Sequence, residues 1–239
     1  HLTIPYIAHI RGSVFNGAGL QSVTLEQGWL ELPEYMFSGC KYLNNVELPE
    51  GLIRLGNYSF SECTSLVKIS MPESLTQIGS AAFSGCTSIR DVQLNEGLVT
   101  LNTYAFEECT SLQYIQLPQS LQNIAHSVFR NCSALKEIVI PEGIKYVSEN
   151  CFSGCKALTD VVLPESILEI YGSAFSYCIS LSNINLPKTI HTIMNKAFYG
   201  CSSLGEIVMP EHVVEVSNYL FYGCNALRSV VLPGLVTSI

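Results

Sequence analysis

The sequence predicts a β-rich, right-handed solenoid of about ten stacked coils, each 23 residues long. Three sets of residues recur at this interval, and a fixed period of 20–50 residues is typical of repeat architectures. From residue 20 to residue 239 no insertion or deletion interrupts the period. The sets are the cysteines Cys40, Cys63, Cys86, Cys109, Cys132, Cys155, Cys178, Cys201 and Cys224; the phenylalanines Phe37, Phe60, Phe83, Phe106, Phe129, Phe152, Phe175, Phe198 and Phe221; and the prolines Pro49, Pro72, Pro118, Pro141, Pro164, Pro187, Pro210 and Pro233.

Each coil is expected to begin with a short strand, as residues 66–72 illustrate. Leu66, Ile69 and Met71 are spaced to place apolar side chains inward from this strand. Pro72 follows, and because proline has no N–H to donate to a β-ladder, it ends the strand and turns the chain. Asn95 replaces the proline in one coil. Parallel strands of successive coils are therefore predicted to form a sheet on the concave face.

The rest of each coil is predicted to be one more extended stretch and one tight turn. Leu75 and Ile78 form a second inward pair, and Ala82, Phe83 and Cys86 are spaced for a short 3₁₀ or α-helical turn. No segment is long enough for an independent helix. A single coil cannot close a hydrophobic core, so the core must form by stacking.

The whole chain, residues 1–239, is predicted to be one domain. Residues 1–19 form an irregular first repeat, which fits the period only if two residues are deleted, and residues 20–239 are regular, with an incomplete last repeat. The chain begins at His1 without an initiator methionine or signal peptide. We therefore expect a mature or excised segment of a longer protein.

The unit identifies the variety of solenoid. A 23-residue period lies within the range of leucine-rich repeats, and Leu66, Ile69 and Met71 reproduce their L-x-x-L-x-L core. With Met71-Pro72 after the strand and Ala82-Phe83-x-x-Cys86 before the next, the chain resembles the BspA-like leucine-rich-repeat family. The resemblance implies a secreted or surface-displayed, adhesin-like protein of host-associated anaerobic bacteria or protozoan parasites. It also implies a protein partner, such as a host extracellular matrix or surface protein.

Composition excludes several classes of protein. Only 13% of the residues are charged and the net charge is −8, so scattered Lys and Arg residues are not expected to bind nucleic acid. With 48% hydrophobic residues the chain is too apolar for disorder. No apolar run approaches the ~18 residues of a membrane span, so no membrane insertion is expected.

The nine periodic cysteines are interpreted as structural thiols. A linear ladder does not converge on one point, as the four ligands of a zinc site must, so neither metal nor cofactor is expected. Disulfides between coils would pair an odd number of equivalent residues. A buried free cysteine acts as a small hydrophobe with a weak S–H donor. Cys151 occupies a position held by alanine in other coils, and we interpret it as a substitute for alanine.

Two candidate partner-binding surfaces emerge from the outward positions. On the concave face one exposed column includes Tyr114, and the next changes from polar residues to valine at Val139, Val162, Val208 and Val231. Exposed apolar stripes mark interfaces, although β-propensity alone also explains valine in strands. At the C-terminal end Tyr177, Tyr199 and Tyr222 lie beside the Phe–Cys turn. Tyrosine is enriched at interfaces, but these rings also suit a role in covering the core.

A ladder of glutamates after the prolines is interpreted as a solvated rim rather than a calcium site, because calcium needs six or more oxygens from several directions. Its members are Glu50, Glu73, Glu96, Glu142, Glu165 and Glu211.

The residues do not suggest an enzyme. The histidines His1, His9, His126, His191 and His212 occupy different positions of the repeat, and no catalytic or phosphate-binding motif is present. The predicted function is non-catalytic protein binding at a cell surface. The alternatives are a structural spacer for another domain and an intracellular interaction scaffold, where reduced thiols are usual. The oligomeric state stays open.

Overall fold

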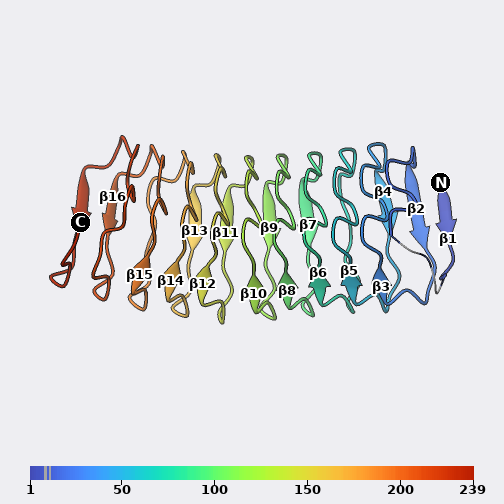
Figure 1. Cartoon of the computed structure of the whole chain (residues 1–239), viewed down its shortest axis with the longest axis horizontal. Helices are drawn as coiled ribbons and strands as arrows, with labels where there is room; N and C mark the ends of the chain where they lie inside the picture. Colours follow the sequence, from blue (N-terminus) through green and yellow to red (C-terminus); the bar gives the residue numbers. More distant parts are fainter. Residues whose placement is uncertain (8–9, 11) are drawn as a thin grey trace.

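A computed structural model describes residues 1–7, 10 and 12–239 of the chain. Figure 1 shows the coils side by side in a single row, with the N-terminal coil at one end and the C-terminal coil at the other. The hydrogen-bonded strands are parallel, and from β2 onward each paired residue lies 23 positions from its partner, as Asp91 does from Tyr114. The period in the sequence is therefore the length of one coil.

One side of the coils carries the longer strands, and the side that follows it in the chain carries two-residue strands. The longer strands are β1 (Leu2–Ile4), β2 (Ser22–Leu25), β4 (Asn45–Glu47), β7 (Asp91–Gln93), β9 (Tyr114–Gln116), β11 (Glu137–Val139), β13 (Asp160–Val162), β16 (Glu206–Val208) and β17 (Ser229–Val231). The shorter strands are β3 (Glu31–Leu32), β5 (Arg54–Leu55), β6 (Gln77–Ile78), β8 (Thr100–Leu101), β10 (Asn123–Ile124), β12 (Tyr146–Val147), β14 (Glu169–Ile170) and β15 (Thr192–Ile193). The predicted extended stretch around Leu75 and Ile78 is thus confirmed.

The long-strand side is not continuous. Ser70 forms only an isolated bridge with Gln93, and the described coil around Asn183 and Asn185 has no strand. Asparagine is disfavoured in strands because its short polar side chain competes for backbone hydrogen bonds, which accounts for the second interruption.

The core follows the predicted inward positions. In the coil that spans residues 66–86, Leu66, Leu75, Ile78, Phe83 and Cys86 have no measurable exposure. Ten phenylalanine rings, from Phe15 to Phe221, form one offset stack with centroids 5.3–6.0 Å apart and planes within 13° of parallel. Such contacts add to the free energy gained by burial.

The third side of each coil corrects the prediction of a helical turn. No 3₁₀ or α-helix is present among the described residues. In residues 79–86, Ala82, Ser84 and Cys86 donate to the carbonyls three residues earlier, whereas Ala81, Phe83 and Gly85 donate to the next coil. Ala81 and Gly85 have φ values of 52° and 73°, and these left-handed residues break any right-handed helix. The side is a row of turns whose alternate N–H groups bind the neighbouring coil.

The irregular first repeat is shorter by two residues, as predicted, and the structure locates the two shortenings. Leu2 pairs with Val23, at a separation of 21, and the ring of Phe15 stacks on Phe37, at a separation of 22. One residue is therefore missing between Ile4 and Phe15, and a second between Phe15 and the regular repeats.

Candidate binding surfaces

The predicted valine column lies on the outer face of the last long strands. Val139, Val162, Val208 and Val231 project from β11, β13, β16 and β17, and between 53% and 64% of each residue is exposed. Large exposure of a valine in every one of these strands makes an apolar stripe, which is interrupted by the exposed Asn185.

Acidic residues flank this stripe. Glu137, Asp160 and Glu206 open the same three strands as Val139, Val162 and Val208, and all three are exposed. Registered pairing of Glu137 with Asp160 aligns the carboxylates from coil to coil. The surface is therefore an apolar column beside an acidic one, and it complements a partner with apolar and basic residues.

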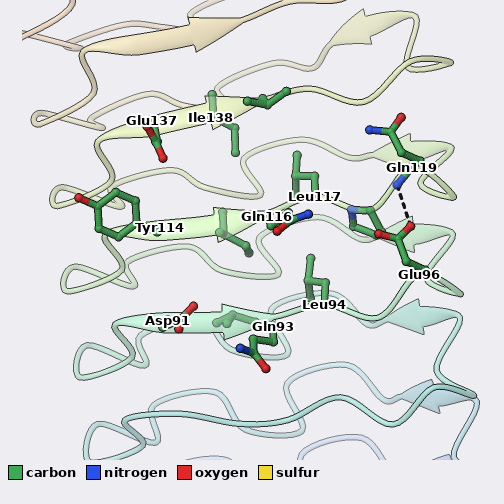
Figure 2. Close-up of a pocket in the computed structure, with 14 residues that line it drawn as sticks. Asp91, Gln93, Leu94, Glu96, Tyr114, Gln116, Leu117, Gln119, Glu137 and Ile138 are labelled. Atoms are coloured by element: carbon green, nitrogen blue, oxygen red, sulfur yellow. Dashed lines mark hydrogen bonds between the residues drawn. The ribbon is translucent and has the colours of Figure 1, made fainter.

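Tyr114 lies in a groove at the N-terminal end of the valine column. The groove crosses β7, β9 and β11, has a volume of about 760 Å³, and includes Val139 in its lining. Figure 2 shows Asp91, Tyr114 and Glu137 at one end of the three strands, with Gln93 and Gln116 farther along them. Lys136 Nζ lies 5.5 Å from the Tyr114 ring centroid and 3.4 Å from its hydroxyl, so this ring is held in place by a neighbouring cation. The structure thus joins Tyr114 and Val139 in one surface.

The predicted tyrosines come together on the turn side of the last coils. Tyr177 meets Tyr199 edge to face with ring centroids 5.3 Å apart, and Tyr199 stacks on Tyr222 at 5.0 Å. Gly200 makes room for Tyr177, because a Cβ on Gly200 would lie 2.8 Å from Cδ1 of that ring. Burial and the hydrogen bond with Tyr177 raise the pKa of Tyr199, which keeps its phenol protonated.

Two residues of this tyrosine cluster were not among those predicted from the sequence. Tyr219 packs against Tyr222 at 6.1 Å, and Lys196 Nζ lies 5.8 Å from the Tyr219 ring. Both residues occupy the repeat position of Tyr35 and Tyr58, whose rings also stack, at 4.7 Å. Reading this position down the repeats would have found them.

The ladder cysteines lie in the core, and all ten cysteines of the chain are free. Each ladder thiol donates a hydrogen bond to a phenylalanine carbonyl of the preceding coil at 3.0–3.2 Å, as Cys109 does to Phe83. Burial raises the pKa of Cys109 well above its ordinary value, and the neighbouring Cys132 raises it further. Cys151, in the alanine position, is also buried, and burial raises its pKa to about 12. Protonated buried thiols are poor nucleophiles and poor metal ligands.

The glutamate ladder is exposed along its length, in agreement with a solvated rim. Glu96 accepts a hydrogen bond from the backbone N–H of Gln119 in the next coil at 3.2 Å, as Figure 2 shows. In the part of the chain that the structure describes, no group of three or more His, Cys, Asp or Glu side chains converges as a metal site would require.

The histidines do not form a common site in the described structure. His191 Nδ1 lies 4.0 Å from Glu169 and 3.0 Å from the Thr192 hydroxyl, on the exposed side of β14 and β15. His9 lies outside the described residues. Among the described residues there is also no helix with the length and hydrophobicity to cross a bilayer.

A parallel-stranded solenoid with 23-residue coils, inward leucines and outward variable columns defines a leucine-rich-repeat protein. The family model for the BspA type leucine-rich repeat region matches residues 8–136 and 122–239. The chain belongs to this family, as its repeat motif predicted.

Solved structures show the same fold. A leucine-rich-repeat protein of T. pallidum is 27% identical, with a TM-score of 0.52 over 75% of this chain and 77% of its own. A leucine-rich cell surface protein of Faecalibacterium prausnitzii is 22% identical, with a TM-score of 0.47 over 96% of this chain and 86% of its own. The pneumococcal vaccine antigen PcpA is 16% identical, with a TM-score of 0.45 over 91% and 73%. None of the curated proteins compared with the chain matches it significantly.

Proposed function

We propose that this chain is a non-catalytic protein-binding module of a secreted or surface-displayed, adhesin-like protein, and that it binds its partner through the valine column. Membership of the BspA-type family supports the proposal, because solenoids of this kind present extended binding surfaces. The observation that carries it is the stripe from Val139 to Val231, more than half exposed at each valine and bordered by carboxylates.

The physical chemistry of the stripe specifies the partner. Burying several exposed valines is favourable at about 25 cal/mol per Å² of apolar surface. The aligned carboxylates of Glu137 and Asp160 select against acidic partners and attract Lys and Arg residues. A host extracellular matrix or surface protein with a basic, partly apolar patch fits both properties.

A charge substitution within one column tests the proposal. Val162→Lys combined with Val208→Lys places two cations in the stripe, and we expect binding to immobilised fibronectin, laminin or collagen to weaken by about tenfold or more. The matched control is Gln93→Lys combined with Gln116→Lys, which makes the same substitution at polar positions of the same column. Equal binding by the valine variant and the unmodified protein would rule the valine column out.

One observation favours a second candidate, an intracellular scaffold. All ten cysteines are free, which is usual in a reducing compartment and less usual outside the cell. The full-length gene product discriminates between the two, because a signal peptide upstream of His1 excludes the cytosol and its absence there excludes classical secretion.

A further inference from the structure

A second groove lies on the turn side of the last coils and shares no residue with the groove around Tyr114. Its volume is about 540 Å³, within the range of small-molecule sites. We call it the tyrosine groove, and its lining consists of Asn150, Ser153, Ser173, Ser176, Tyr177, Lys196, Tyr199, Tyr219 and Tyr222.

The aromatic rings of the groove offer both faces and edges. Tyr199 and Tyr222 are nearly parallel, with an interplanar angle of 14°. Tyr177 and Tyr219 cross them at 70° and 74°. A ring face carries partial negative charge and attracts polarised C–H groups, so the cluster provides platforms for a flat ligand with C–H bonds on its face.

Every residue of the lining also carries a hydrogen-bonding group. Seven of them are hydroxyls, and Ser176 is only 4% exposed although no protein group in the described structure pairs with its hydroxyl. Earlier in the same column Arg130 forms an ion pair with Glu107 at 3.2 Å, so elsewhere the position satisfies itself across coils. A nearly buried hydroxyl without a partner is costly unless a ligand or water supplies one.

The charge of the groove differs from that of the whole molecule. Lys196 is its single charged residue, in a chain whose net charge is −8. Its ammonium group lies over the Tyr219 ring and adds a donor at the edge of the platform. A ligand that carries one carboxylate complements this arrangement.

We propose that the tyrosine groove binds a short acidic oligosaccharide, a function separate from protein binding by the valine column. The C–H faces of two or three sugar rings stack on Tyr199 and Tyr222, and the sugar hydroxyls bind the serine and tyrosine hydroxyls. Lys196 pairs with the carboxylate of a uronic or sialic acid. A proline-rich peptide also stacks on aromatic rings, but it brings hydrogen-bond acceptors without donors, so it leaves the acceptor capacity of these hydroxyls unused.

The test begins with an array that carries sialylated, glucuronate-containing and galacturonate-containing oligosaccharides, their neutral counterparts and decaproline. We expect binding to acidic saccharides in preference to neutral ones. The strongest one is then titrated calorimetrically. Tyr199→Ala should weaken its binding by about tenfold. Tyr222→Phe keeps the ring and should retain most of the affinity, and Lys196→Gln should abolish the preference for acidic over neutral saccharides.

Two controls keep the test specific. Tyr58→Ala removes a stacked ring at the repeat position of Tyr219 but outside the groove, and Val162→Lys alters only the valine column, so neither should change saccharide binding. The urea midpoint of each variant reports on folding. Absence of binding to every acidic saccharide, tighter binding of decaproline, or equal affinity of the Tyr199→Ala variant would each overturn the proposal.

Discussion

The thiol of Cys109 shows how a single residue links two coils. Its sulfur donates to the Phe83 carbonyl at 3.2 Å, and the same carbonyl accepts the N–H of Cys86 at 3.1 Å. A carbonyl has two lone pairs, and here a side chain and a backbone group occupy them. The cysteine therefore fills core volume and also satisfies a buried backbone group.

Replacement by alanine measures this role. Cys109→Ala removes the sulfur and its hydrogen bond, and we expect a loss of about 1–2 kcal/mol in the free energy of unfolding. Cys151→Ala is the matched control, because alanine already occupies that position at Ala82, Ala105, Ala174 and Ala197, and it should cost less than about 1 kcal/mol. Urea denaturation of the two variants measures both changes, and equal losses would contradict the proposed role of the thiol.

At the scale of the element, the row of turns depends on backbone conformations that glycine favours. One position has φ between 57° and 78° in nine successive coils, and glycine occupies it in five of them. The residues are Gly39, Glu62, Gly85, Glu108, Asn131, Gly154, Tyr177, Gly200 and Gly223. Each residue other than glycine bears the cost of the left-handed region, about 1–2 kcal/mol.

Glycine and alanine should therefore reverse their order of stability within three residues. At Glu108 the glycine variant should be more stable than the alanine variant by about 1 kcal/mol. At the exposed Thr110, which is outside the left-handed set, the alanine variant should be the more stable by about 0.5–1 kcal/mol. Thermal unfolding of the four variants gives the comparison, and the same order at both sites would show that the turn is not strained.

These turns mark the boundary of what the sequence could predict. Inward positions such as Leu66, Ile78 and Phe83 follow from apolar periodicity and are confirmed. The alternation of local and inter-coil hydrogen bonds around Ala81 depends on backbone angles, which alanine, tyrosine and lysine do not signal. For the same reason the groove completed by Lys196 and Tyr219 was only partly predicted, since it depends on which turn side chains face one another.

At the scale of the molecule, the ten buried thiols should make stability sensitive to alkaline pH. Burial raises the pKa of Cys86, Cys132 and Cys178, as it does for the other cysteines, so they stay neutral in the folded chain. In the unfolded chain a thiol ionises near pH 8.5, and above that pH the unfolded state binds fewer protons than the folded state. The stabilisation is thus complete below about pH 8 and is lost as the pH rises.

The loss should be steep because many thiols contribute. Each fully buried thiol contributes about 1.4 kcal/mol for one pH unit above 8.5. We expect the urea midpoint to be level from about pH 6 to 8 and to fall sharply between about pH 8.5 and 10. A midpoint that does not change up to about pH 10 would mean that the thiols are solvated or oxidised.

The central claim is that the cysteines count coils, each as a free thiol in the core, and do not form disulfides or metal sites. Titration of the protein with the thiol reagent DTNB, without prior reduction, tests this claim most directly. In native buffer we expect slow reaction, because the thiols are buried and protonated. In guanidinium chloride all ten cysteines should react at once. Fewer than about eight reactive thiols in the denatured protein would contradict the claim.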